Sequence, residues 1–162
     1  MLRDPNLVPL SRQHQHALAL CVRINRAALA NSIEVKAWQA EIQQHFEQEI
    51  QYHFAAEEMF LFPATRHYPE LIPLVDELLG EHAQLRDYFA QAARAALDGA
   101  AIREFGNTLS SHIRKEERQL FEELQKRMAA ETLREIGRQI DAALAAAPEA
   151  CITPTESVLS KL

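Results

Sequence analysis

The sequence has little of what interrupts helices or crosslinks a chain. Only four of its 162 residues are glycine, whereas helix-favouring residues such as Ala, Leu and Glu are frequent, so we expect helix along almost the whole chain. The two cysteines, Cys21 and Cys151, form no C-x-x-C pair, which argues against a disulfide framework. No run approaches about 18 apolar residues, and we therefore expect no membrane-spanning helix.

A basic surface and a targeting leader are also missing. The formal net charge is −6 and the pI is about 5.6, with no basic stripe, which argues against a nucleic-acid partner. No basic segment followed by an apolar one opens the chain, so we expect a cytoplasmic protein. A length of 162 residues, of which 48% are hydrophobic, predicts a single domain with a packed core.

Helical periodicity is the main pattern that is present. It predicts an all-α fold, namely an up-down-up-down four-helix bundle with an extra C-terminal helix. The expected helices cover residues 11–30, 33–62, 69–97, 101–129 and 131–147. We place a bundle domain at 1–147, with its core at 8–128, and a flexible tail at 148–162. Pro63 is expected to close the second helix.

The fifth predicted helix is amphipathic. We expect it to pack outside the bundle or in a dimer contact, so the chain is predicted to be a monomer or a homodimer. Cys21 lies on an apolar helix face without a defined acidic neighbour and is interpreted as core packing.

Each of the four long helices is predicted to carry one histidine on its inward face. These are His14, His53, His82 and His112. His53 and Glu57 lie four residues apart, which places both on one face of a helix. The pair His112 and Glu116 repeats this pattern. Because a buried carboxylate needs a cation or good hydrogen bonds, the set predicts a metal site. Its imidazole and carboxylate ligands suit iron or manganese in a bundle core.

Several polar residues near these positions have alternative interpretations. Taken singly, each histidine is more often a hydrogen-bonded core residue, so a helical bundle without metal stays open. His16 is the alternative ligand if the first helix is rotated. His45 is interpreted as a flank residue without a ligand role, and Glu49 as an inward hydrogen-bond acceptor for a ligand imidazole. Glu58 and Glu117 are expected to face solvent.

With these residues in place, the chain resembles the hemerythrin-like (HHE cation-binding) family over about residues 8–128. The likeness is carried by LSRQHQHAL at 10–18, His53-x-x-x-Glu57 with the following EMFLFP, Glu81-His82, and His112-x-x-x-Glu116-Glu117. It implies a non-haem diiron centre with two iron ions in the bundle. By that resemblance the four inward histidines are terminal ligands, and Glu57 and Glu116 bridge the irons.

The chain departs from the oxygen-carrying hemerythrins at two places. Arg86 stands where those proteins have a second histidine one turn after the third-helix ligand. The last motif spaces His112 and Glu116 more closely than their His-to-Asp motif. The resulting set of four His and two Glu looks more like that of the di-iron repair proteins for iron–sulfur centres. Arg86 could stabilise a bound anion, although we prefer an ion pair with a bridging or outer carboxylate.

The sequence supports three functional hypotheses. The first is a diiron protein that binds O₂ or NO, or holds iron, for sensing, storage or delivery, with manganese or zinc possible on purification. The second is an enzyme in which the same centre reduces NO or peroxide or repairs iron–sulfur centres. The third is a structural bundle whose histidines make only internal hydrogen bonds.

Overall fold

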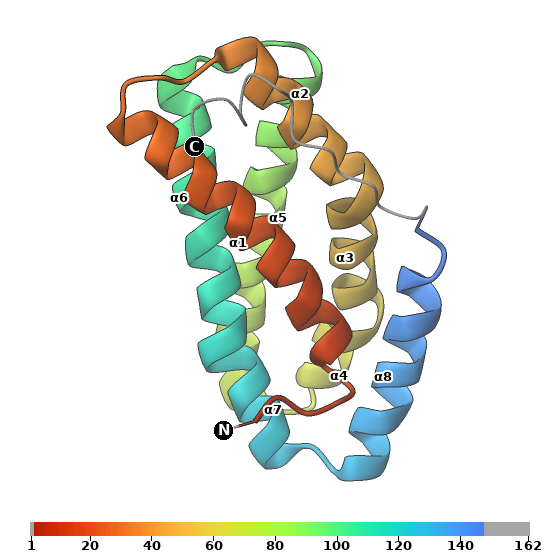
Figure 1. Ribbon diagram of the computed structural model, residues 1–162. Helices are drawn as coiled ribbons and strands as arrows, with labels where there is room; N and C mark the ends of the chain where they lie inside the picture. Colours follow the sequence, from red (N-terminus) through yellow and green to blue (C-terminus); the bar gives the residue numbers. More distant parts are fainter. Residues whose placement is uncertain (1, 148–162) are drawn as a thin grey trace.

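Four long helices run up, down, up and down in the computed structural model, which describes residues 2–147, and a fifth helix lies along one side (Figure 1). We call the segments 8–29, 35–65, 69–93 and 99–127 the first, second, third and fourth helices. The elements are α1 (Val8–Leu29); α2 (Val35–His45), η1 (Phe46–Ile50), α3 (Gln51–Ala56), η2 (Glu57–Leu61) and α4 (Phe62–Thr65); η3 (Pro69–Leu71) and α5 (Ile72–Ala93); α6 (Gly99–Lys115), η4 (Glu116–Leu120) and α7 (Phe121–Arg127); and α8 (Ala130–Leu144). The predicted all-α bundle with an extra C-terminal helix is confirmed. The tail predicted at 148–162 lies outside the described residues.

The second helix does not end at Pro63, as the sequence had indicated, but continues to Thr65. The reason is a π-helical turn, η2, directly before the proline. In this turn the N–H of Phe62 donates to the carbonyl of Glu57, five residues earlier. An α-helix would bring the proline ring against the carbonyl four residues back, and the wider turn relieves that clash. Pro63 therefore follows a π turn inside a helix and does not close it.

The third helix ends earlier than predicted, at Ala93 and not near Leu97. Ala95 adopts φ 56°, a left-handed conformation that cannot continue a right-handed helix. The N–H of Ala96 then donates to the carbonyl of Gln91 at 2.9 Å, which satisfies an end carbonyl of the helix. The fourth helix starts two residues earlier than predicted, because the Asp98 carboxylate accepts the N–H of Ala101 and caps it.

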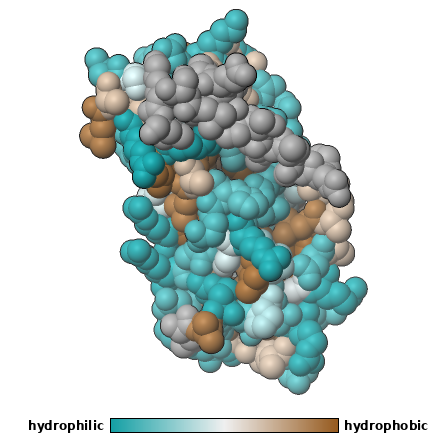
Figure 2. Space-filling model, viewed as in Figure 1, coloured by the Kyte–Doolittle hydropathy of each residue, from teal (hydrophilic) through white to brown (hydrophobic). Residues whose placement is uncertain are grey.

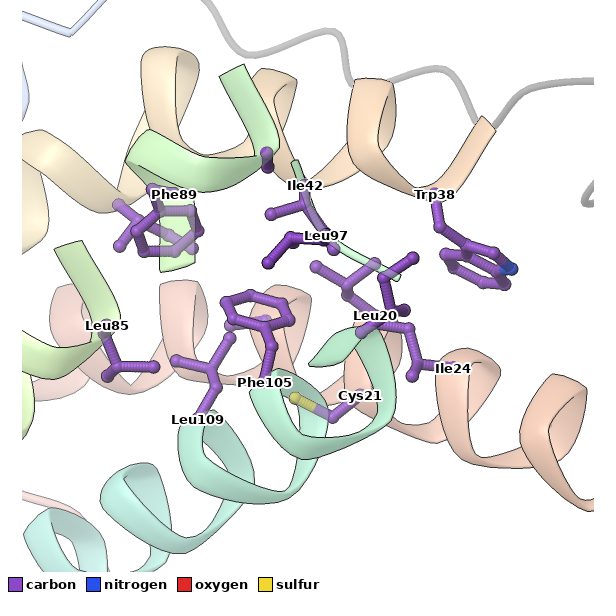
Figure 3. Close-up of a cluster of buried hydrophobic side chains, with 14 of the residues drawn as sticks. Leu20, Cys21, Ile24, Trp38, Ile42, Leu85, Phe89, Leu97, Phe105 and Leu109 are labelled. Carbon is purple, nitrogen blue, oxygen red and sulfur yellow. The ribbon is translucent and has the colours of Figure 1, made fainter. Parts of the chain in front are cut away.

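Two apolar clusters fill the bundle, and the inward histidines lie between them. One, the Phe105 cluster, packs residues of α1, α2, α5 and α6 (Figure 3). The other, the Phe62 cluster, lies nearer the chain's first residues and includes part of α8. Leu78 and Leu85 belong to different clusters, and His82 stands between them on α5. The apolar core is therefore interrupted at its middle by a polar layer.

Cys21 lies inside the Phe105 cluster, which confirms its interpretation as a core residue (Figure 3). Burial raises the pKa of its thiol to about 12. The thiol therefore stays protonated near neutral pH and offers no thiolate to a metal.

The helix α8 packs outside the bundle, against α3 and η2, which is one of the two predicted arrangements (Figure 1). Its buried residues include Leu133, Ile136 and Ile140. Gly137 lies against the N-terminal segment, where an added Cβ atom would stand 2.6 Å from Cβ of Asn6. Hydrophilic side chains predominate on the face drawn in Figure 2. Within the described part of the chain, the helices are too short or too polar to cross a membrane.

Candidate metal centre

Six side chains from the four long helices meet in the polar layer. They are His14 from α1, His53 from α3, Glu57 from η2, His82 from α5, His112 from α6 and Glu116 from η4. None is more than 4% exposed. All six positions were predicted to face inward, and the structure brings all six together.

The six side chains form two overlapping groups. The ligand atoms of His14, His53, Glu57 and Glu116 lie within 4.8 Å of one another, and those of His82, His112 and Glu116 do the same. Glu116 belongs to both groups. Each group has the size and chemistry of the ligand set of one metal ion.

The two carboxylates face both groups. Glu57 places Oε1 3.2 Å from Nε2 of His53 and Oε2 3.4 Å from Nε2 of His82. Glu116 places Oε2 3.1 Å from Nε2 of His14 and 3.3 Å from Nε2 of His112. Each carboxylate thus contacts one histidine of each group, which is the arrangement that a bridging ligand requires.

The polar atoms at the centre of this layer lack hydrogen-bond partners. Among the described residues, Nε2 of His14 and His53 and all four oxygens of Glu57 and Glu116 are buried without a partner in hydrogen-bond geometry. Burial of such atoms is costly unless a cation compensates for the lost water. The donor set therefore fits a bound metal.

The pair His82 and His112 gives the same indication. Their Nε2 atoms lie 3.2 Å apart, and each Nδ1 contacts a carboxylate, which can only accept a hydrogen bond when ionised. The proton of each neutral ring therefore sits on Nδ1, and the Nε2 lone pairs of two neutral rings would meet. Either a second proton on one ring or a metal ion bound by both Nε2 atoms removes this repulsion.

Each of the four imidazoles is held at Nδ1 by a side chain from a neighbouring helix. The pairs are His14 with Glu117 at 2.7 Å, His53 with Gln13 at 2.9 Å, His82 with Glu58 at 2.7 Å and His112 with Glu81 at 2.9 Å. An acceptor at Nδ1 leaves Nε2 free for a metal and fixes the orientation of the ring.

The prediction that Glu58 and Glu117 face solvent is wrong. Their side chains are only 28% and 19% exposed, and both bind imidazoles of the adjacent helix. The prediction measured their direction from the histidine on their own helix and ignored the next helix. In addition, η2 and η4 are π turns, which separate successive residues by a smaller angle than an α-helix does.

Sequence reasoning also misjudged other polar residues. Gln13 and Glu81 were given no role, although each directly precedes an inward histidine. Glu49 was expected to accept from a ligand imidazole, but its Oε1 lies 2.8 Å from Nδ1 of His16. The side chain of His16 is 61% exposed and belongs to neither ligand group. His45 is buried, and among the described residues neither of its ring nitrogens has a partner in hydrogen-bond geometry, although Nε2 lies 3.8 Å from Oε1 of Glu41.

The buried carboxylates of the centre raise the pKa values of two of its imidazoles. Burial lowers the pKa of His14, but the carboxylates of Glu116 and Glu117 outweigh burial and raise it to about 10. Burial likewise lowers the pKa of His82, and Glu57 and Glu58 raise it to about 9. Without metal, protons on these imidazoles therefore balance the buried carboxylates, and a metal ion must displace them.

The acceptors on the outside of the layer stay ionised. The hydrogen bond with His82 lowers the pKa of Glu58 to about 2, with Arg86 contributing. Burial raises the pKa of Glu117, but hydrogen bonds with His14 and Ser11 outweigh it and lower that pKa to about 2.

Arg86 pairs with an outer carboxylate, as we preferred from the sequence. Its Nη1 donates to Oε1 of Glu58 at 2.7 Å, and its guanidinium lies 5.4 Å from the centre of the Phe54 ring. It is engaged in this ion pair at the edge of the centre.

A small cavity adjoins the centre on one side. Its volume is about 10 Å³, and His14, His53 and His112 line it together with apolar residues such as Ala17, Ile50 and Leu109. A cavity of this size has room for about one water-sized molecule.

Fold and site together define a helical-bundle protein with a buried histidine and carboxylate centre, which fits a metal-binding protein. The chain belongs to the hemerythrin HHE cation-binding domain family, because the family model matches residues 8–124. This finding confirms the resemblance seen in the sequence. No curated protein and no solved structure matches the chain.

Proposed function

We propose that this chain is a non-haem diiron-binding protein. His14 and His53 would hold one iron ion and His82 and His112 the other, and Glu57 and Glu116 would be shared between the two ions. The observation that supports this most strongly is the pair of ligand groups that share Glu116. In addition, the oxygens of Glu57 and Glu116 have no hydrogen-bond partner among the residues that the structure describes. Imidazole and carboxylate without thiolate suit iron or manganese better than a structural zinc site.

The proposed ligand of the centre is O₂ or NO. When bound, two irons supply coordination sites and electrons for such a diatomic molecule. The cavity beside His14 and His53 is small, and its apolar neighbours Ala17, Ile50 and Leu109 suit an uncharged molecule. We propose that the protein uses this centre for sensing, storage or delivery.

Metal content and absorption test the proposal directly. Full-length protein purified without a histidine tag and loaded anaerobically with Fe²⁺ should hold about two iron ions per chain. Exposure to O₂ or NO should then add ligand-to-iron absorption bands in the visible range. The variant His82→Ala should lose iron, whereas His16→Ala, a change at an exposed histidine, should retain it. Fewer than about one iron per chain after loading would refute the proposal.

The alternative is an enzyme that reduces NO or peroxide at the same centre, or that repairs iron–sulfur centres. One observation supports reduction, which consumes protons. Glu49 lines the cavity, and its Oε1 contacts the exposed His16. Its Oε2 is buried and has no hydrogen-bond partner within the described part of the chain. Glu49 is thus placed to pass protons from the surface to the cavity. If this alternative holds, iron-loaded protein supplied with a chemical electron donor should turn over NO or peroxide, and the Glu49→Gln variant should do so more slowly with unchanged iron content.

A further inference from the structure

The hydrogen bonds that hold the four imidazoles form a closed ring around the bundle. Gln13 of the first helix holds a histidine of the second, Glu58 of the second holds one of the third, Glu81 of the third holds one of the fourth, and Glu117 of the fourth holds one of the first. We call these four residues the acceptor ring. Each is adjacent in sequence to an inward side chain of the centre. Every helix therefore contributes to the centre and also orients a histidine on the next helix.

Three members of the acceptor ring are carboxylates, and each has its own cation. Glu58 pairs with Arg86, Glu81 with Lys115 and Glu117 with Arg3. The fourth member, Gln13, is a neutral amide. Within the part of the chain that the structure describes, its side chain hydrogen-bonds only to His53.

The neutral amide among the acceptors makes the two ligand groups different. His82 and His112 both donate to carboxylates, whereas in the other group His14 donates to a carboxylate and His53 to the amide of Gln13. An anionic acceptor at Nδ1 makes an imidazole more electron-rich and a better metal ligand than a neutral acceptor does.

We propose that the two metal positions are unequal and that Gln13 sets the difference. The position of His82 and His112 binds its ion more tightly, and the position of His14 and His53 is the weaker and more exchangeable one. This inference rests on the proposed function, since it requires that the centre bind two ions.

The cavity supports the same division. Gln13, His14 and His53 all line it, whereas the tighter position contributes only His112. The weaker position is therefore the one next to the space for an incoming small molecule.

Stepwise titration of the full-length protein with Co²⁺, followed by its visible absorption, tests the inference. Wild-type protein should bind two cobalt ions in a tight and a weaker step. Gln13→Glu places a carboxylate beside His53 and should tighten the weaker step about 10-fold, so that the two steps converge. Glu58→Gln removes a carboxylate beside His82 and should weaken the tighter step about 10-fold. Gln15→Glu makes the same charge change at an exposed position of the same helix and should alter neither step.

Mutual repulsion of two bound ions would also give two binding steps of different affinity. The variants therefore decide whether Gln13 causes the difference. A Gln13→Glu protein with wild-type steps, or with a change only in the tighter step, would overturn the inference while leaving two-metal binding intact. If Gln13→Glu does not fold, Glu58→Gln and Glu81→Gln decide, and an unchanged tighter step in both overturns it. Failure of wild-type protein to bind two ions would instead overturn the proposed function. Thermal unfolding of each metal-free variant shows whether it is folded.

Discussion

Raising the pH should tighten metal binding steeply, because metal ions and protons compete for the same imidazole nitrogens. Against the effect of burial, neighbouring carboxylates raise the pKa of His14 to about 10 and that of His82 to about 9. Both rings therefore carry a second proton, on Nε2, at neutral pH when no metal is present. Each must lose it before Nε2 can bind a metal ion.

The size of the effect follows from these two values. Binding of two metal ions at pH 7 should release about two protons from this pair of rings. The overall two-metal binding constant should therefore increase about 100-fold between pH 7 and pH 8. The gain should shrink to about 10-fold per pH unit between pH 9 and pH 10, because His82 has then lost its proton, and should vanish at higher pH.

Calorimetric titration with Co²⁺ in buffers of different ionisation enthalpy measures the number of protons released. His16→Ala is the control, since this exposed ring lies outside both ligand groups and its loss should leave the number unchanged. Release of fewer than about one proton at pH 7, or an affinity that does not change with pH, would show that the carboxylates do not keep these rings protonated.

Three further predictions concern the metal-free protein. Its stability in chemical unfolding should be highest between about pH 4.5 and 6.5. The contribution of His14 to the free energy of unfolding is complete below its unfolded pKa of 6.5 and is lost as the pH rises through about 10. The contribution of Glu117 is complete above its unfolded pKa of 4.5 and is lost as the pH falls through about 2. Gly137→Ala should destabilise the fold by about 1–3 kcal/mol in the same assay, because the new methyl group would overlap Asn6. Finally, Cys21 should not react with a thiol reagent until the protein unfolds, and rapid labelling of this residue in the native state would contradict its burial.

The inward faces of the helices could be predicted from the sequence because each depends on one helix alone. Apolar periodicity gave the inward direction, and the residues at positions such as His53 and Glu57 share it by helical geometry. The same argument placed His14 inward and His16 outward on the first helix, as the structure shows. Cys21 was interpreted correctly by the same logic.

Contacts between helices could not be predicted in this way. Glu58 and Glu117 were assigned to solvent because nothing in one helix shows where the next helix lies. The error was increased by the π turns at η2 and η4, which start at the two inward carboxylates and change the local rotation. The prediction for Pro63 was wrong because of the π turn η2, which accommodates the proline and has no simple sequence signal.

The centre is expected to serve binding and to contribute little to stability, and a double substitution can separate the two. Replacing both Glu57 and Glu116 by Gln removes the buried charges and keeps the shape. The single amide NH₂ introduced by Glu57→Gln can then donate to Nε2 of either His53 or His82, which lie 3.2 and 3.4 Å from the two present Glu57 oxygens. The ring that accepts from this amide no longer needs a second proton, because its Nδ1 atom remains held by the acceptor ring.

The metal-free double variant should therefore be at least as stable as the metal-free wild type at pH 7, since removal of buried charges as a set is often neutral or favourable. Its metal affinity should fall by more than about 100-fold, because the two carboxylates proposed as shared ligands are lost. The decline in stability above pH 6.5 that is assigned to His14 should also become smaller, because Glu116 no longer raises the pKa of His14 and only Glu117 still does. Thermal unfolding and Co²⁺ titration measure these effects. A metal-free double variant that is clearly less stable than the wild type would mean that the carboxylates hold the bundle together even without a metal.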